Sequence, residues 1–256
     1  MTPLLETRGL SKTFGGLKAV QNVDLCIGAN RIVSVIGPNG AGKTTFFNCL
    51  SGIYRPDGGA ILLEGRDITG HPPHEVCKRG VARTFQNIRL FPEMTVLENV
   101  LVAQFQHRSL SPLPLLLRSP HFCAREHECR EEALGFLEFV GLARYADAIS
   151  ISLAYGLQRR LEIARALATK PRLLLLDEPA AGMNPQEAVE MVQLISRIRE
   201  RGLAILLIEH HMKVVMTISD EILVLDHGVP IAHGAPAQVR NDPQVIKAYL
   251  GEEISN

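Results

Sequence analysis

The sequence predicts an α/β fold in which a parallel sheet is interrupted by an inserted helical segment. An apolar strand, "IVSVI" at 32–36, leads into a glycine-rich loop and a helix, and a second apolar strand lies in "RLLLLDEP" at 172–179. Between them, from about 94 to 170, the sequence becomes helical in character. Strands that alternate with helices are typical of parallel sheets, so we expect the helical stretch to be an insertion.

The remaining elements follow in chain order. Residues 4–35 predict short strands separated by glycine turns, and the turn-rich stretch 52–70 again favours β-structure. Within "REEALGFLEFVGL", the apolar residues recur at the spacing of a helix face: Ala133, Leu134, Leu137 and Val140. After the second apolar strand, the pattern predicts a helix at roughly 185–201, a strand "AILLIE", and a hairpin around Asp226, His227 and Gly228.

Composition limits the possible classes of protein. With 256 residues, of which 46% are hydrophobic, the chain can bury a large core. Lys+Arg and Asp+Glu both number 27, so bulk charge predicts no nucleic-acid partner. The apolar runs are short, whereas a membrane span needs about 20 apolar residues, and the first residues do not resemble a signal peptide. Five irregularly spaced cysteines favour a reducing cytoplasm.

The stretch "GPNGAGKTT" predicts a phosphate-binding loop because it has the spacing G-x-x-x-x-G-K-[ST] between a strand and a helix. In such a loop, backbone N–H groups surround the phosphates, the lysine reaches the β and γ phosphates, and the following hydroxyl suits Mg²⁺. The candidate ligands of a nucleoside triphosphate are Gly37, Pro38, Asn39, Gly40, Ala41, Gly42, Lys43, Thr44 and Thr45.

The strand "LLLLDEP" supplies two candidate carboxylates. Asp177 ends a buried strand, where it is placed to approach Mg²⁺ beside a phosphate loop. Glu178 is the next residue and is a candidate base for the attacking water, a role worth roughly 10²–10⁴-fold in rate.

Together these motifs resemble, over essentially the whole chain, the ATP-binding subunits of ABC transporters. The resemblance is greatest to the ATPases of branched-chain amino acid uptake systems, through the strings "FGGLKAV", "RTFQNIRLF", "EMTVLENVLVAQ", "RRLEIARAL", "LLLDEPAAGMNP", "LLIEHHMKVVM" and "VIKAYLGEE". It implies one domain over 1–256: a RecA-like P-loop NTPase core with an antiparallel β subdomain and a helical subdomain inserted at about 88–165. It also implies ATP and Mg²⁺ as cofactors.

The resemblance assigns further roles residue by residue. Phe14 matches an aromatic residue that stacks on adenine, and Gln86 matches the glutamine that completes the contacts to Mg²⁺ and water. His210 matches the histidine that touches the γ-phosphate. In "LAYGLQ", Ala154 and Gly156 lie in the signature motif, a helix N-terminus that in this family faces the ATP of a second subunit.

Three positions depart from the wider family. Ala154 occupies a position that usually holds Ser, and Leu157 one that usually holds Gln, so two side-chain polar contacts are absent. We therefore expect a competent but slower half-site. Asn184, in the loop along the dimer seam, replaces an Asp that many relatives carry, which is expected to shift contacts there without abolishing them.

The partners implied are a second ATPase, identical or different, two transmembrane permeases and, through them, a substrate-binding protein. The chain would then lie peripherally on the cytoplasmic face of the inner membrane. Two alternative cargoes are urea or short amides, and exported lipopolysaccharide, although the segment 107–130 is longer than the lipopolysaccharide type would have. A third alternative, an ABC protein acting on ribosomes or DNA, usually has two cassettes or a coiled-coil arm.

One cluster raises the question of a metal site. "HFCAREHEC" holds His121, Cys123, His127 and Cys129, and the second and third of these would share a helix face. The two H-x-C pairs do not match the usual zinc-finger spacings, so we do not predict a zinc site.

Overall fold

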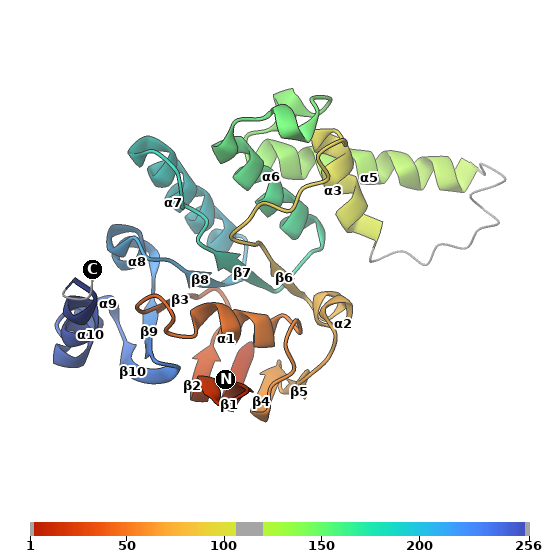
Figure 1. Cartoon of the computed structure of the whole chain (residues 1–256). Helices are drawn as coiled ribbons and strands as arrows, with labels where there is room; N and C mark the ends of the chain where they lie inside the picture. Colours follow the sequence, from red (N-terminus) through yellow and green to blue (C-terminus); the bar gives the residue numbers. More distant parts are fainter. Residues whose placement is uncertain (1–2, 106–119, 254–256) are drawn as a thin grey trace. The chain divides into compact units, whose positions relative to one another are not determined.

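The computed structural model describes residues 3–105 and 120–253, which form two compact units (Figure 1). Thr84–Pro171 make one, called the helical unit here. The described residues before and after it make the other, the core unit.

A six-stranded sheet organises the core unit, in the order β10-β9-β3-β8-β7-β6. Five of its strands run parallel, and β10 pairs antiparallel with β9 at one edge. The strands are β3 (Ile32–Ile36), β6 (Val81–Arg83), β7 (Leu173–Asp177), β8 (Ala204–Ile208), β9 (Glu221–Asp226) and β10 (Val229–Gly234). The predicted α/β fold with a parallel sheet is confirmed.

A second, antiparallel sheet of the core unit has the order β2-β1-β4-β5. Its strands are β1 (Leu5–Phe14), β2 (Leu17–Ile27), β4 (Gly58–Leu63) and β5 (Arg66–Asp67). Helix α1 (Lys43–Leu50) lies between the two sheets (Figure 1), and its fully buried Phe46 and Phe47 join one apolar cluster with residues of both. This packing fixes the helix that follows the phosphate loop.

Further helices complete both units. The core unit contains α2 (Pro73–Lys78), α7 (Pro185–Glu200), α8 (Met212–Ile218), α9 (Pro236–Arg240) and α10 (Pro243–Glu253). The helical unit contains α3 (Val96–Gln104), α5 (Pro120–Phe139), α6 (Tyr155–Ala168) and the short 3₁₀ turns Ala143–Tyr145 and Ser150–Ser152. Between β9 and β10, His227 and Gly228 have φ of 47° and 79°, as a two-residue hairpin turn requires, which confirms the predicted hairpin.

Strands β3, β7 and β8 are buried at every residue, as the sequence predicted from their continuous apolar runs. Their register aligns the carboxyl ends, because Val35 and Asp177 both pair with Ile208. Loops that follow neighbouring parallel strands therefore leave the sheet at one edge, where α/β folds commonly bind ligands.

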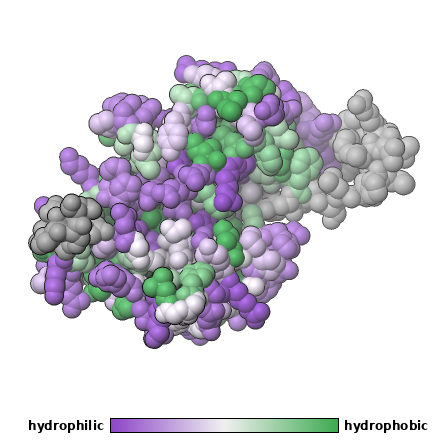
Figure 2. All heavy atoms as spheres, viewed as in Figure 1, coloured by the Kyte–Doolittle hydropathy of each residue, from purple (hydrophilic) through white to green (hydrophobic). Residues whose placement is uncertain are grey.

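Among the helices of the described residues, none combines the length and the apolar composition needed to cross a membrane. The face drawn in Figure 2 is mainly hydrophilic, with apolar residues in separate small groups. Of the four candidate zinc ligands considered above, His121 and Cys123 have side chains that lie outside the described part of the chain.

Candidate functional site

The candidate site of the core unit is built from three loops at the carboxyl edge of the six-stranded sheet. One loop follows β3, one follows β7 and one follows β8, which are adjacent strands. The phosphate loop, the two candidate carboxylates and the candidate histidine are thus gathered by strand order, although they are far apart in sequence.

The phosphate loop connects β3 to α1 and depends on two glycines. Gly42 caps α1 with a φ of 98°, and a Cβ there would lie 2.2 Å from the backbone oxygen of Ala19. At Gly37, with a φ of 151°, a Cβ would lie 2.0 Å from the oxygen of Leu225. Both positions combine left-handed backbone with a close backbone neighbour, so each requires glycine.

The loop concentrates positive charge. Lys43 Nζ donates to the carbonyl oxygens of Gly37 and Pro38 at 2.6 and 2.7 Å, which holds the ammonium group over the loop. The first turn of α1 has no acidic residue, so the partial positive charge of the helix N-terminus is not offset there. Pro38 and Ala41 are buried, Thr45 is half-buried, and Asn39, Gly40 and Thr44 are exposed. The arrangement suits an anion such as a phosphate.

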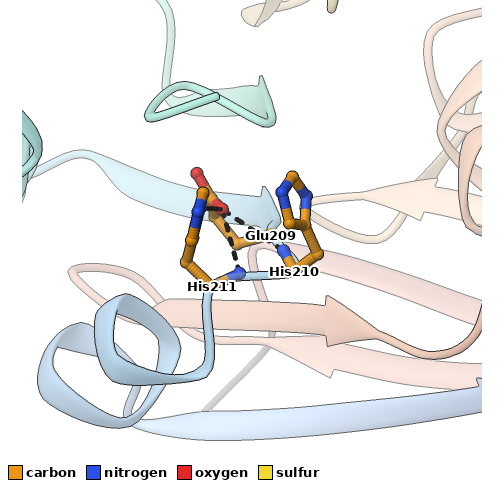
Figure 3. A group of neighbouring side chains, drawn as sticks. All are labelled: Glu209, His210 and His211. Carbon is orange, nitrogen blue, oxygen red and sulfur yellow. Dashed lines mark hydrogen bonds and ion pairs between the residues drawn. The ribbon is translucent and has the colours of Figure 1, made fainter. Parts of the chain in front are cut away.

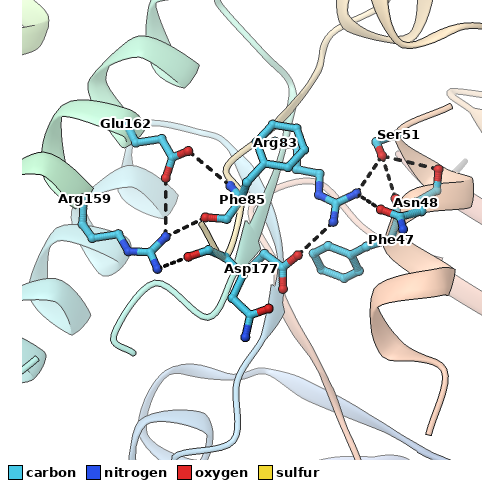
Figure 4. Close-up of polar contacts among 9 residues, drawn as sticks. Phe47, Asn48, Ser51, Arg83, Phe85, Arg159, Glu162 and Asp177 are labelled. Carbon is cyan, nitrogen blue, oxygen red and sulfur yellow. Dashed lines mark hydrogen bonds and ion pairs between the residues drawn. The ribbon is translucent and has the colours of Figure 1, made fainter. Parts of the chain in front are cut away.

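Asp177 ends β7, and an arginine from the neighbouring strand β6 holds its carboxylate. Arg83 Nη2 donates to Asp177 Oδ2 at 2.8 Å, and both side chains are almost fully buried, at 6% and 4% exposure. Arg83 also donates to Asn48 Oδ1 at 2.6 Å and to Ser51 Oγ at 2.9 Å, beside α1 (Figure 4). The sequence analysis did not identify Arg83 as part of the site.

Glu178 and His210 meet across two adjacent strand ends. His210 Nδ1 lies 3.6 Å from Glu178 Oε1, and the histidine side chain is half exposed. Glu178 has a backbone φ of 48°, which is unusual for a residue with a side chain. Its backbone N–H donates to the carbonyl oxygen of Ile208 at 2.9 Å. Backbone strain of this kind often occurs at functional sites. A carboxylate with a nearby imidazole can accept a proton from water and remain oriented.

Glu209 is a second buried carboxylate that the sequence analysis did not single out (Figure 3). It accepts the backbone N–H groups of Ala180 at 3.0 Å, of His210 at 3.2 Å and of His211 at 3.4 Å. It therefore ties the loop after β8 to the loop that follows Glu178. One carboxylate oxygen of Glu209 and one ring nitrogen each of His210 and His211 lie within 4.8 Å of one another. The carboxylate, however, already accepts hydrogen bonds from these three amides.

Phe14 lies at the end of β1 with 41% of its surface exposed. The rings of Phe14 and Tyr54 pack edge to face, with their centroids 5.2 Å apart. Lys12 Nζ lies 5.3 Å from the centroid of the Phe14 ring. An exposed aromatic ring, held from one side, can stack against a planar base.

The helical unit holds the other candidate residues. Gln86 lies in an irregular segment after β6, while Ala154 is the N-cap of α6 and is exposed. Gly156 is buried in the first turn of that helix. Ala154 offers no side-chain acceptor, so the α6 N-terminus has no side-chain cap. Leu157, the other departure in this motif, is half-buried.

Asn184 has a structural role that is independent of any partner. It is the N-cap of α7: its Oδ1 accepts the N–H of Glu187 at 2.9 Å, and Glu187 Oε2 accepts the N–H of Asn184 at 2.9 Å. Asn and Asp serve equally well at this position, so the departure noted in the sequence leaves the helix start intact.

Comparison with known proteins decides the family. A family model described as ABC transporter matches residues 20–181. The chain belongs to the ABC transporter family. A second model, described as branched-chain amino acid ATP-binding cassette transporter, matches residues 229–255 of this cassette. These matches confirm the resemblance stated from the motifs.

Two curated relatives match the cassette over almost its whole length. The high-affinity branched-chain amino acid transport ATP-binding proteins BraF of Pseudomonas aeruginosa and LivG of Escherichia coli K12 are each 53% identical over 251 residues, covering 98% of both chains. A solved structure, the ADP conformation of MJ1267, an ATP-binding cassette of an ABC transporter, aligns with a TM-score of 0.86 and 34% identity. It covers 98% of this chain and 100% of that one. This chain is therefore an ATP-binding ATPase subunit of a transporter.

Proposed function

We propose that this cassette energises an importer of branched-chain amino acids by hydrolysing ATP. The hydrolytic part is carried by one observation, the contact between Glu178 and His210 at the sheet edge that also bears the phosphate loop. The cargo is supported by the match of residues 229–255 and by the 53% identity to BraF and LivG.

The residues at the phosphate loop fit a magnesium nucleotide. Thr44 offers a hydroxyl and Asp177 a carboxylate within the core unit, and Gln86 would add an amide oxygen from the helical unit. All three are oxygen donors, which Mg²⁺ prefers. When bound, the ion would neutralise negative charge on the phosphate oxygens. Lys43 and the N-terminal amides of α1 would hold the phosphates themselves.

Two residues would act on the terminal phosphate. Glu178 would accept a proton from the attacking water, and His210, 3.6 Å from it, would orient that carboxylate and donate toward the γ-phosphate. At the base of the nucleotide, Phe14 would stack on the adenine.

The α6 N-terminus favours a second cassette as partner. Its first turn has no acidic residue and no side-chain cap at Ala154, so its backbone amides suit a phosphate from another subunit. The proposed assembly contains a second ATPase, two transmembrane permeases and a substrate-binding protein, with this cassette peripheral on the cytoplasmic face of the membrane. Zero net charge gives no support to a nucleic-acid partner.

Copurification and uptake together test this function. The tagged chain is purified from solubilised membranes and its companions are identified by mass spectrometry. We expect multi-span permeases and a related ATPase, and we expect uptake of labelled leucine to require the wild-type chain. A matched strain carrying Glu178→Gln should assemble the same complex but not import leucine.

The alternatives predict different results. Uptake of urea or a short amide, with leucine uptake unchanged, would move the cargo to the urea type. Recovery of ribosomal or DNA-repair proteins without a permease would reject transport altogether, leaving only ATP hydrolysis.

A further inference from the structure

Helix α6 carries a buried pair of opposite charges, Arg159 and Glu162. Their side chains are 3% and 2% exposed, and Arg159 Nη1 lies 3.5 Å from Glu162 Oε2. Arginine and glutamate at an i, i+3 spacing normally form a solvent-exposed pair on a helix surface. Burial of both groups is costly unless further hydrogen bonds satisfy them, so their other partners matter.

Arg159 finds those partners in the segment that contains Gln86. Its Nη1 donates to the carbonyl oxygen of Phe85 at 2.6 Å, and its Nη2 donates to the carbonyl oxygen of Gln86 (Figure 4). The same guanidinium donates to Tyr155 Oη at 2.7 and 3.0 Å, in the first turn of α6. One side chain thus joins the start of the helix to two successive backbone carbonyls.

Glu162 binds the complementary groups of the same segment. Its Oε1 accepts the backbone N–H of Phe85 and that of Arg89, each at 3.4 Å. Arg89 in turn places its guanidinium 4.1 Å from the ring centroid of Phe85, which closes the segment on itself. Residues 85–89 have no helix or strand of their own, so side chains of α6 provide hydrogen bonds that secondary structure would otherwise supply.

We propose that Arg159 and Glu162 are positioning residues that fix the Gln86 segment to α6, so that Gln86 and the α6 N-terminus move as one body. Carbonyls are held by the guanidinium and amides by the carboxylate, which fixes both position and direction of the backbone. The inference deepens the proposed function and rests on it for the role of Gln86.

The attachment of Gln86 to α6 would link the two nucleotides of the proposed dimer. In the proposed dimer, Gln86 faces the nucleotide of its own chain, while Ala154 and Gly156 at the α6 N-terminus face that of the partner. If α6 holds both Gln86 and its own N-terminus in place, a shift at one nucleotide is transmitted through this helix to the other.

Hydrogen exchange tests the attachment directly and does not depend on turnover. The test variant is Arg159→Met/Glu162→Leu, in which apolar groups of similar size replace the pair, because such replacements commonly leave folding intact. We expect amides in 84–90 to exchange at least about tenfold faster, with those of α5 unchanged. Unchanged exchange in 84–90 would overturn the proposal.

A double-mutant cycle tests whether the pair acts through Gln86. We expect Gln86→Ala and the apolar pair each to lower kcat roughly ten- to hundredfold, since small misplacements of catalytic groups have effects of this size. Combined, they should fall within about twofold of Gln86→Ala alone, because the pair then has nothing left to position. Losses that multiply would mean that the pair does not act through Gln86.

Two further variants separate positioning from general damage. Arg159→Lys keeps the charge and should restore part of kcat, since an ammonium can bond one carbonyl but lacks the planar fork. Lys170→Met removes a cation of the same unit that pairs with Glu132 at 2.7 Å instead, and should leave kcat within about twofold. Failure of the proposed function would appear separately, as a wild-type chain without ATP turnover, and the exchange experiment would still decide the inference.

Discussion

Arg83 Nη2 donates to Asp177 Oδ2 at 2.8 Å, and this buried ion pair joins β6 to β7. The same guanidinium bonds Asn48 and Ser51, next to the helix that follows the phosphate loop. Contacts within the protein alone therefore hold the carboxylate proposed to approach Mg²⁺ relative to that loop. Preorganisation of this kind lowers the cost of assembling a site.

Replacing Arg83 with methionine should destabilise the core unit. The change leaves Asp177 as a buried carboxylate without its guanidinium, and breaking a buried pair in this way costs about 3–5 kcal/mol. Urea unfolding of purified protein would measure the loss. Arg172→Met is the matched control, because Arg172 pairs with Glu64 at the surface and should contribute at most about 1 kcal/mol. Equal stability of the two variants would contradict the role given to Arg83.

Glu178→Gln and Lys43→Ala should fail in different ways. The first removes the proposed base, so turnover should fall roughly 10²–10⁴-fold while ATP still binds. The second removes the ammonium that lies over the loop, so ATP binding itself should weaken. Equilibrium binding of labelled ATP beside steady-state hydrolysis separates the two effects. Near-normal turnover in Glu178→Gln would reject its role as base.

Phe14→Ala should weaken ATP binding roughly five- to hundredfold, because stacking on a base contributes about 1–3 kcal/mol. Leu17→Ala is the control: Leu17 starts the next strand and is more exposed, at 69% against 41%, but has no aromatic ring. Because stacking tolerates any base, GTP and CTP should compete with ATP for binding. An unchanged dissociation constant for Phe14→Ala would remove the residue from the site.

Glu162→Gln should change how stability depends on pH. Burial raises the pKa of Glu162 above 4.5, although Arg159 opposes this, so the folded chain binds the proton more tightly than the unfolded chain. That contribution is present below about pH 4.5 and is lost as pH rises through the folded pKa. The variant should therefore gain stability relative to wild type as pH rises above about 4.5, measured by urea unfolding.

Glu98→Gln gives the opposite sign and serves as control. A hydrogen bond from the Thr95 backbone N–H lowers the pKa of Glu98, so this carboxylate stabilises the fold above its ordinary pKa and loses that effect as pH falls. The stability of wild type relative to Glu98→Gln should therefore increase as pH rises. The same sign for both variants would show that the Glu162 carboxyl is not governed by burial.

Cys49 should react slowly with iodoacetamide in the folded protein. It is buried in α1, and burial raises the pKa of its thiol to about 11, so only about one thiol in a thousand is ionised at pH 8. Cys26 is exposed and should react faster than Cys49. Because ATP binds only the folded chain, it should slow labelling of Cys49 further. Comparable rates for the two cysteines, measured by mass spectrometry, would contradict the burial.

The main elements of the fold and part of the site could be predicted from the sequence. Continuous apolar runs identified β3, β7 and β8. Asp177 at the end of β7 and Glu178 directly after it could then be assigned to one edge of the sheet. Arg83 was missed because its partner lies 94 residues away, and local sequence does not reveal that β6 is the neighbour of β7. A lone arginine at the end of a three-residue strand gives no signal by itself.

Glu162 and Arg159 illustrate a different limit. Their spacing is that of an ordinary surface ion pair, and only the tertiary structure shows that both are buried against an irregular segment. Periodicity identifies a helix and its apolar face, but charged residues on the remaining faces are ambiguous between solvent and backbone partners. Glu209 is similar, since a carboxylate that follows an apolar strand can be a ligand, a base or, as here, an acceptor for three amides.

The two crowded glycines of the phosphate loop limit how the motif can be transferred. Gly37 rests against Leu225, and Gly42 against Ala19, so strands from both ends of the chain shape the loop. A graft of the nine residues "GPNGAGKTT" into another strand and helix would lack both supports. Phosphate binding is in this sense a property of the assembled core, and protein engineers would have to move the flanking strands together with the motif.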